Sequence, residues 1–319
     1  MTLYYQDDYV TLYHGDSLEV LPALDIEAHV LLTDPPYFKV KQEEWDNQWD
    51  KASDFLGWMG DFLDQAKPLL APQASVWVFA SPAMTSSVER LVGERFRVLN
   101  SVRWVKEAGW HQKAEIATLR SYLTAWEGVV FAETGERFAP IGDYIRDERQ
   151  RAGLSRTDLE VSLGYTSTAD PSKGTALCYR WEEGSSIPSA EAYQKARGVL
   201  GAGYLEREHA DLVDEYESLR RPFNIKTRAQ STDVWNFAPV APFAGKHPCE
   251  KPEAMLRHMI ETSSRPGELV LDPFAGSGAT LLAASNSGRR AVGIEKDERW
   301  CEHAANRLSQ GTLELEWTA

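Results

Sequence analysis

The stretch 270–280, VLDPFAGSGAT, constrains the fold of this chain more than any other segment. The apolar run Glu268–Leu271 predicts a buried strand, and the pattern from Thr280 to Ser287 predicts a helix. Small residues between them let a ligand lie against the backbone, and the first turn of the helix offers free N–H groups. We therefore expect an α/β sheet with a ligand-binding turn at the end of this strand.

A carboxylate follows the next predicted strand, Arg290–Ile294. Glu295 lies about 20 residues beyond Gly276, the spacing at which an acidic side chain can hold ribose hydroxyls. Nicotinamide-dependent enzymes use a similar geometry, and a tight turn without a ligand has the same pattern. A Walker-type phosphate loop is excluded, because no Gly-Lys-Ser/Thr follows. The turn alone thus predicts a ligand without naming it.

A second turn, Thr33-Asp34-Pro35-Pro36-Tyr37, ends the apolar run Ala28–Thr33, which predicts another buried strand. Each proline restricts its own φ and disfavours helix in the residue before it, so the turn is stiff. It holds a carboxylate, a carbonyl oxygen and an aromatic face in fixed relation, at the edge where open α/β sheets bind ligands.

These groups suit the activation of the exocyclic amine of a base. If the Asp34 carboxylate and the Pro35 carbonyl accept the amine hydrogens, the nitrogen lone pair is freed to attack a sulfonium methyl group. Tyr37 would then stack on a base swung out of the duplex. A proline-rich loop with a stacked aromatic is the alternative interpretation.

Three regions differ in character along the 319 residues. Residues 1–134 and 246–319 alternate short apolar runs with helical patterns, which implies a mostly parallel sheet. Residues 135–245 hold two helical stretches, several glycines and an irregular run instead. We expect an α/β domain built from the two outer regions and a small, mainly helical insert between them.

Composition bounds the function only loosely. The net charge of −14 is unusual for a DNA-binding protein, but basic residues gather in the stretches 95–120 and 220–228. Charge therefore neither supports nor excludes a nucleic-acid partner, because a local basic face is what matters.

Several classes of protein are disfavoured. The apolar runs are far shorter than a membrane span, and Met1–Asp8 is too polar for a signal peptide. Cys178, Cys249 and Cys301 form no CxxC pair, which argues against a structural zinc site or a disulfide scaffold. We expect a cytoplasmic protein without a membrane segment or a metal.

Together, the two turns resemble the motifs of the DNA amino-methyltransferase family (N6-adenine/N4-cytosine). The Asp-Pro-Pro-Tyr turn precedes the Gly-rich turn, as in the circularly permuted β group, and a target-recognition region lies between them. A segment similar to His247–Pro252 (HPCEKP) precedes the Gly-rich turn, and Gly15-Asp16-Ser17 lies upstream of Asp34. The resemblance covers roughly 10–134 and 230–308.

The resemblance implies a Rossmann-like sheet that binds S-adenosyl-L-methionine and acts on double-stranded DNA. The resemblance implies a gene of a bacterium or a phage and a role in restriction–modification. It is also compatible with a homodimer. The catalytic turn would be Asp34, Pro35, Pro36 and Tyr37. The cofactor would contact Asp16, His247, Lys251, Asp272, Phe274, Gly276, Gly278 and Glu295, with a helix cap as the alternative for Asp16.

Family members with Asp at the first position of the turn mostly modify adenine N6, whereas those with Ser mostly modify cytosine N4. Asp34 therefore favours adenine, with cytosine N4 as the alternative. Cytosine-C5 enzymes use a Pro-Cys nucleophile, but that mechanism does not use Asp-Pro-Pro-Tyr. We interpret Cys249 as a small filler residue within the lysine–proline segment.

Residues 141–201 have a second resemblance, to the Cro/repressor-type helix-turn-helix, with Ser155 as a helix cap. The stretch 165–176 is longer than the usual turn. Such an insert would read base edges in the major groove, with Lys173, Thr175 and Arg180 as candidates. Alternatively, it packs on the sheet or mediates dimerisation, or the whole chain is a DNA-binding regulator with a decayed methylase.

The polar loop Lys39–Lys51 follows the catalytic turn and holds two tryptophans, Trp45 and Trp49. It would either close over a flipped base or be an ordinary surface loop with its tryptophans packed on the domain. The sequence does not favour one over the other.

Overall fold

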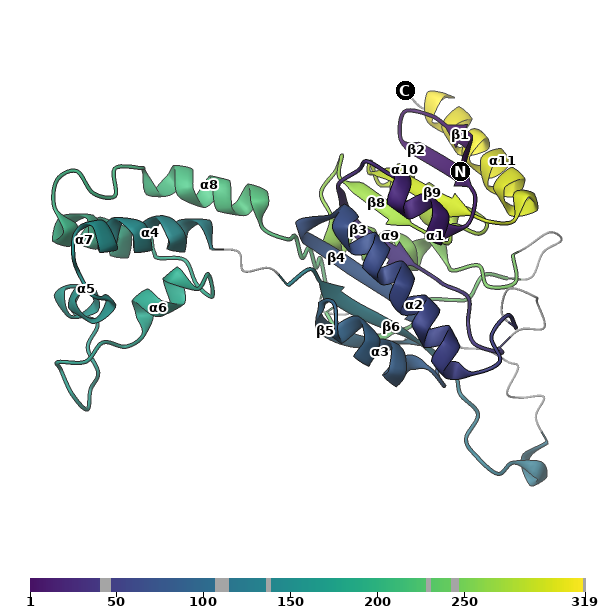
Figure 1. Ribbon diagram of the computed structural model, residues 1–319, viewed down its shortest axis with the longest axis horizontal. Coiled ribbons are helices and arrows are strands. Elements are labelled where there is room, and N and C mark those ends of the chain that lie inside the picture. Colours follow the sequence, from purple (N-terminus) through teal and green to yellow (C-terminus); the bar gives the residue numbers. More distant parts are fainter. Residues whose placement is uncertain (41–46, 107–114, 136–138, 228–230, 242–246, 318–319) are drawn as a thin grey trace. The chain divides into compact units, whose positions relative to one another are not determined.

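The computed structural model describes residues 1–40, 47–106, 115–135, 139–227, 231–241 and 247–317, with the side chains of 116 and 311–317 left out (Figure 1). The chain forms two compact units. The first contains residues 1–135 and 221–319, and the second contains 136–220. The region in which we predicted target recognition, 135–245, is thus divided between the helical unit and part of the larger one.

The larger unit is built on a nine-stranded sheet. Its central strands run parallel, whereas β6 is antiparallel to both of its neighbours and β1 is antiparallel to β2. In the order of the sheet, the strands are β1 (Thr2–Gln6), β2 (Val10–His14), β9 (Arg290–Glu295), β8 (Leu269–Asp272), β3 (Ala28–Thr33), β4 (Leu70–Ala80), β6 (Trp126–Glu133), β5 (Arg97–Val105) and β7 (Val234–Trp235).

The order in which strands are added to the sheet reverses between β3 and β8. These strands are neighbours, with Val30 opposite Val270. From β8 the chain passes through a helix to β9 on one side, and from β3 it passes through a helix to β4 on the other. Such a topological switch leaves a crevice at the carboxyl ends of the two strands, where open α/β sheets bind ligands. The predicted α/β, Rossmann-like fold is confirmed, with its two sequence halves in permuted order.

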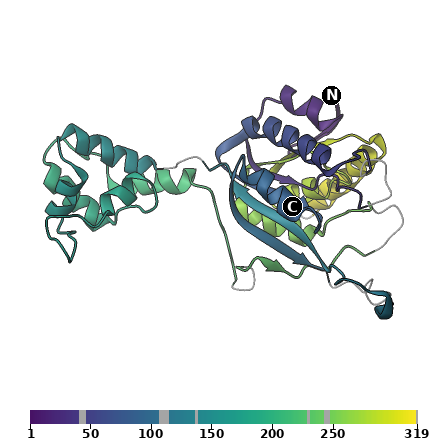
Figure 2. The same ribbon diagram turned by 60° about the horizontal axis from the view of Figure 1, so that its bottom comes forward.

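Helices cover both faces of the sheet (Figure 1, Figure 2). Successive strand residues alternate between two cores: Trp77 of β4 packs on one face with Met255, and Val78 packs on the other with Phe55. Burial on both faces explains the nearly continuous apolar character of these strands. The helices are α1 (Ser17–Val20), α2 (Ala52–Ala66), α3 (Thr85–Gly93), α9 (Glu253–Ser263), α10 (Ala279–Asn286) and α11 (Glu298–Trp317), with 3-10 turns at Leu21–Ala23, Lys67–Leu69 and Ile116–Thr118.

The second unit consists of helices around a core of its own. Its buried Glu182 pairs with Arg149 at 2.7 Å and with Arg156 at 2.5 Å, so the carboxylate is neutralised inside the unit. Ser155 caps a helix in a capping box with Asp158, as we predicted for the cap. The helices are α4 (Pro140–Arg151), α5 (Arg156–Ser162), α6 (Leu177–Glu182), α7 (Ala190–Leu200) and α8 (His209–Leu219).

Gly142→Ala is expected to destabilise the helical unit by about 1–3 kcal/mol, because overpacking forces the backbone to move. A Cβ at Gly142 of α4 would lie 1.9 Å from the carbonyl oxygen of Trp181. Gly198→Ala in α7 is the matched control, since a Cβ there meets nothing within 4 Å. Hydrogen exchange of peptides from 139–220 measures the effect. Equal protection in the two variants would contradict the packing described here.

Trp49 packs on the domain rather than standing free. Its ring lies 4.7 Å from that of Trp58 and 5.1 Å from that of Phe55. Trp45, the other tryptophan of the loop, lies outside the described residues. Of the two interpretations of this loop, the position of Trp49 agrees with a surface loop whose tryptophan packs on the domain.

Candidate active site

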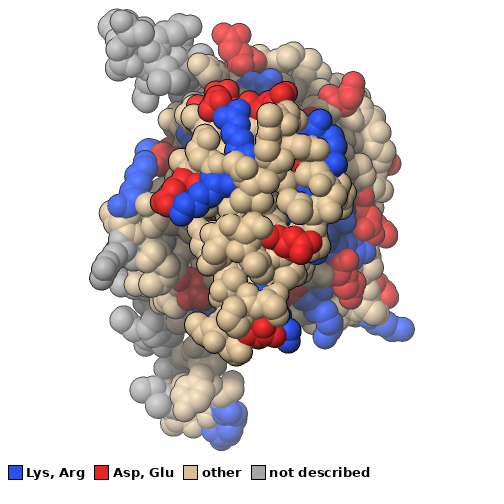
Figure 3. All heavy atoms as spheres, turned by 90° about the vertical axis from the view of Figure 1, so that its left-hand side faces the viewer, with Lys and Arg blue, Asp and Glu red and all other residues tan. Residues whose placement is uncertain are grey.

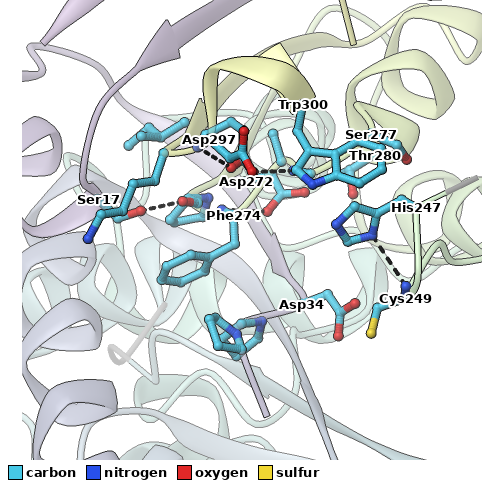
Figure 4. A pocket seen from close by; sticks show the side chains of 18 of the residues that line it. Ser17, Asp34, His247, Cys249, Asp272, Phe274, Ser277, Thr280, Asp297 and Trp300 are labelled. Atoms are coloured by element: carbon cyan, nitrogen blue, oxygen red, sulfur yellow. Dashed lines mark hydrogen bonds between the residues drawn. The ribbon is translucent and has the colours of Figure 1, made fainter. Parts of the chain in front are cut away.

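A cavity of about 530 Å³ lies at the carboxyl ends of β3 and β8, a size typical of small-molecule sites. Most of its lining comes from four segments: 34–37 after β3, 247–251 before α9, 272–280 at the end of β8, and 294–300 at the end of β9; Asp16, Ser17, Gln48, Trp58 and Leu256 add to it. In Figure 4, Asp34 and Cys249 lie next to each other near His247, and Phe274 stands across the cavity from them. The fold thus brings the two predicted turns into one site.

The Gly-rich turn shapes one wall of this cavity. Gly276 has a φ of +50°, and a Cβ there would lie 3.5 Å from the ring of His247, so this position favours glycine. The Glu295 carboxylate accepts the N–H of Gly276 at 2.8 Å and that of Asp297 at 2.7 Å. These bonds fix the turn to the end of β9. Burial raises the pKa of Glu295, and the backbone N–H groups oppose this shift.

Asp272 is a buried carboxylate at the end of β8. Burial raises its pKa to about 7, while bonds from Thr280 and from the backbone N–H of Phe274 oppose the shift and Asp34 adds to it. The N–H of Phe274 donates to Asp272 Oδ1 over 3.1 Å. The acid is therefore close to half-protonated at neutral pH.

Asp272→Asn is expected to stabilise the chain in a pH-dependent way. The pKa of Asp272 is about 7 in the folded chain and about 4 when unfolded. The folded state therefore holds a proton that the unfolded state releases, and wild-type stability falls as pH rises through this window. The variant lacks this loss, and should gain up to about 4 kcal/mol at about pH 8 but much less at about pH 5. Urea unfolding without cofactor measures both, and equal differences at the two pH values would contradict the assignment.

Asp34 lies at the end of β3 with its two carboxylate oxygens in different environments. Oδ2 accepts a charge-assisted bond from Lys251 Nζ. Oδ1 is buried and has no hydrogen-bond partner among the described residues. Burial raises the pKa of Asp34, Lys251 opposes this and Glu127 adds to it. An unpaired buried acceptor is costly, so Oδ1 marks a position where a ligand N–H would be stabilised.

Lys251 contacts three acceptors. Besides Asp34, its Nζ lies 3.6 Å from Glu127 Oε2 and 3.3 Å from the carbonyl oxygen of Cys249. Burial lowers the pKa of Lys251, but the two carboxylates outweigh it and hold the pKa above its ordinary value. The ammonium group therefore lies on the Asp34 side of the cavity.

His247 is buried against the ring of Trp300, at a centroid distance of 4.4 Å. Burial, together with the positive charge of Lys251, lowers its pKa to about 4. His247 Nδ1 accepts the N–H of Cys249 over 3.3 Å. The imidazole is thus neutral near pH 7 and forms part of the wall by its shape.

The predicted cofactor residues are mostly, but not entirely, at the cavity. Asp16 lines it while capping α1 through Leu18 N at 2.9 Å and pairing with Lys296 at 2.8 Å. Gly278 does not line it, and a Cβ there would instead lie 2.9 Å from Cβ of Ala304 in α11. The remaining predicted residues line the cavity: Asp34, Pro35, Pro36, Tyr37, His247, Lys251, Asp272, Phe274, Gly276 and Glu295.

A family model described as DNA methylase, for N6 and N4 methyltransferases, matches residues 28–306. This chain belongs to the DNA methylase family. The match spans both turns and the segment between them, so it covers all of the catalytic turn and most of the cavity. The family predicted from the two turns is thereby confirmed.

Relatives of this DNA methylase are similar over nearly their whole length. The type II methyltransferase M2.DpnII of Streptococcus pneumoniae is 24% identical over 325 residues, which cover 96% of this chain and 91% of the relative. The DNA adenine methyltransferase YhdJ of Escherichia coli is 24% identical over 307 residues, which cover 93% and 82%.

Solved structures share the fold. The M1.HpyAVI–SAM complex has a TM-score of 0.54 and 19% identity, covering 94% of this chain and 98% of that one. The PvuII DNA methyltransferase, which is cytosine-N4-specific, has a TM-score of 0.56 and 15% identity, covering 96% and 88%. At these identities the likeness confirms the methyltransferase fold of this DNA methylase and no finer property.

Sequence reasoning missed a charged pair beside the catalytic turn. Glu127 opens β6 and pairs with Lys106, which follows β5. The hydroxyl of Tyr37 donates to Glu127 Oε2 over 3.4 Å. The order of the predicted strands could have indicated this pair. Lys106 follows one predicted strand and Glu127 begins the next, so antiparallel pairing of the two strands places both residues at the same edge of the sheet, the edge that carries Asp34.

Three other predicted residues of this DNA methylase are not among the residues that line the cavity. Lys173, Thr175 and Arg180 belong to the helical unit and are exposed. Lys173 lies 3.5 Å from Asp170. Among the described residues, no helix has the length and apolarity of a membrane span, and no acidic, histidine and cysteine side chains are grouped as ligands for a metal ion.

Proposed function

We propose that this DNA methylase transfers a methyl group from S-adenosyl-L-methionine to the exocyclic N6 amine of adenine in double-stranded DNA. One observation carries the proposal. Asp34 Oδ1 is a buried acceptor without a partner among the described residues, and it belongs to a stiff turn that lines the cavity. An amine hydrogen of a flipped base would satisfy it.

The cavity suits the cofactor by its donor set and size. The Glu295 carboxylate, held in place by the N–H of Gly276, and the open face of Gly276, which has no side chain, would form a cradle for a nucleoside. Asp272, Phe274, Asp16 and His247 would complete it. When bound there, S-adenosyl-L-methionine supplies an electrophilic sulfonium methyl group.

The residues of the catalytic turn orient the target amine. Asp34 Oδ1 and the carbonyl oxygen of Pro35 accept its two hydrogens, which localises the nitrogen lone pair for attack. The ring of Tyr37 is largely buried at the cavity wall, and the part of it that remains exposed would contact the base. No general base is required, because the extra proton leaves the amine after the methyl group has been transferred.

Adenine is favoured over cytosine by two observations. The first residue of the turn is Asp34 rather than serine, and the relative YhdJ is a DNA adenine methyltransferase. The fold does not distinguish the bases, since the cytosine-N4-specific PvuII enzyme shares it. The carboxylate of Asp34 accepts hydrogen bonds and donates none, so it can hold an amine hydrogen and leave the nitrogen lone pair available for attack.

The substrate class is tested by transfer of labelled methyl groups to double-stranded DNA and to RNA of the same sequence, offered separately and in competition. We expect label on DNA and none on RNA. Label on RNA alone, or on the protein itself, would overturn the assignment to DNA. Binding of S-adenosyl-L-methionine, measured by calorimetry, separates a failure to bind cofactor from a failure to act on DNA.

The helical unit supports a role in site recognition. Lys173, Thr175 and Arg180 are exposed on or just before α6, where a recognition helix would follow α5. In the view of Figure 3, basic and acidic side chains are interspersed on this unit rather than gathered in one basic face. Recognition by this unit would therefore rest on a few side chains at base edges, with phosphate contacts from basic residues that lie among acidic ones.

Arg180→Ala is therefore expected to relax the preference for the methylated site, by about 1–3 kcal/mol at one base position. Sequencing of the methylated sites after partial methylation of genomic DNA measures this preference. An unchanged preference in this variant and in a chain lacking 141–201 would contradict recognition by the helical unit and favour a packing or dimerisation role.

A further inference from the structure

Glu127 lies at the start of β6, next to the catalytic turn, and was assigned no role by its sequence. Its carboxylate pairs with Lys106 and lies 3.6 Å from Nζ of Lys251, and it accepts the hydroxyl of Tyr37 over 3.4 Å. One carboxylate thus contacts the cation that holds Asp34 and the ring expected to stack on the base. We propose that Glu127 is a positioning residue for methyl transfer, acting through Lys251 and Tyr37. This inference rests on the proposed function.

Charge balance explains why a second carboxylate is needed beside Asp34. Asp34 and Glu127 carry two negative charges, and Lys106 and Lys251 carry two positive ones, all in a mostly buried cluster. Burial raises the pKa of Glu127, but Lys251 and Lys106 outweigh it and hold the pKa below its ordinary value, so Glu127 is ionised. Buried charges of this kind persist only when they are paired.

Sharing Lys251 between two carboxylates preserves the acceptor strength of Asp34. With Glu127 present, the ammonium group bonds Asp34 Oδ2 and also faces Glu127. Without that second charge, the full attraction of Lys251 would act on Asp34 and draw the ammonium group toward Oδ1. The oxygen expected to accept the amine hydrogen would then be weakened or blocked.

The hydroxyl bond fixes the ring of Tyr37. The ring is buried at 6% exposure, and Lys251 Nζ lies 5.2 Å from its centroid. Because the hydroxyl is the far end of the side chain, anchoring it on β6 holds the ring in its place at the cavity wall. A ring held in place lets the base stack with a smaller ordering cost at the moment of reaction.

The same strand offers a matched control. Glu133, at the other end of β6, also has 15% side-chain exposure and also pairs with two basic residues, Arg97 and Arg221, each at 2.6 Å. Neither carboxylate lines the cavity itself, but Glu127 contacts two residues that do, Lys251 and Tyr37, whereas the basic partners of Glu133 do not line it. If Glu127 had only a structural role, Glu127→Gln and Glu133→Gln would have similar effects on kcat and on the kcat–pH profile.

The test compares wild type, Glu127→Gln, Glu127→Asp and Glu133→Gln, as full chains, with labelled S-adenosyl-L-methionine and unmethylated duplex DNA. We expect Glu127→Gln to lower kcat by about 10- to 100-fold while cofactor binding in calorimetry is unchanged. Its acidic limb in the kcat–pH profile should move to lower pH, because the charge of Glu127 raises the pKa of Asp34. Glu127→Asp keeps the charge, so its acidic limb should lie between those of Glu127→Gln and wild type. Glu133→Gln should match wild type in both kcat and pH profile.

Each result decides the inference. Equal kcat and equal pH profiles for Glu127→Gln and wild type would overturn it while leaving the proposed function intact, whereas a wild type that labels no DNA would overturn both. If Glu127→Gln does not fold, Glu127→Asp carries the test, because it keeps the charge but draws the carboxylate back from Lys251 and Tyr37. A kcat and a pH profile equal to those of wild type in that variant would then overturn the inference.

Discussion

Asp34→Ala is expected to lower the rate of methyl transfer by about 10²–10³-fold, the loss seen when one preorganised hydrogen-bonding group is removed from an active site. The substitution removes the unpartnered acceptor Oδ1 and also the partner of Lys251. Cofactor binding should persist, because Asp34 follows β3, whereas the expected nucleoside cradle lies at the ends of β8 and β9. Single-turnover rates with saturating cofactor measure the step directly.

Asp34→Asn is the matched variant for this prediction, since it keeps the volume and one acceptor oxygen but loses the charge. Its rate should fall between those of wild type and Asp34→Ala. A rate for Asp34→Ala equal to wild type, with cofactor bound in both, would contradict the role given to this carboxylate. A loss of cofactor binding in both variants would instead place Asp34 in the cofactor site.

Lys251→Met is expected to destabilise the chain by about 3–5 kcal/mol, because it leaves Asp34 and Glu127 buried without their shared cation. It should also raise the pKa of Asp34, since Lys251 is the group that opposes the effect of burial there. Asp34 must be ionised for its Oδ1 to accept an amine hydrogen well. The acidic limb of the kcat–pH profile is therefore expected to move to higher pH, opposite to the shift predicted for Glu127→Gln.

Lys226→Met provides the comparison for this second prediction. Lys226 pairs with Glu261 at 3.0 Å, but its side chain is 71% exposed, and exposed pairs contribute at most about 1 kcal/mol. Chemical unfolding of the two variants separates the effects. A loss for Lys251→Met no larger than that for Lys226→Met would contradict the buried charge cluster.

The turns of the site could be predicted because each is a local pattern. Asp34 and Asp272 each end an apolar run, and the prolines and glycines after them announce a turn without any knowledge of tertiary contacts. The same locality holds for Ser155, whose capping box with Asp158 involves residues three apart. Such features depend only on residues that are close in sequence, so they can be recognised without a structure.

The charged partners could not be predicted in the same way. Lys251 was expected near the methionine part of the cofactor, and its contact with Glu127 joins residues more than a hundred positions apart. The buried Glu182 of the helical unit is similar, because its carboxylate is buried with the cations Arg149 and Arg156, which tertiary structure brings to it. The edge strands β1 and β7 were also not predicted; β7 has only two residues, too few for a period to show.

Methylation of adenine at N6 by this DNA methylase is measured by nucleoside analysis. Unmethylated genomic DNA is incubated with the protein and labelled S-adenosyl-L-methionine, digested to nucleosides and separated. We expect label in N6-methyladenine and in no other nucleoside. Label in N4-methylcytosine would contradict the choice of base, and unlabelled DNA despite bound cofactor would contradict methylation of DNA by this site.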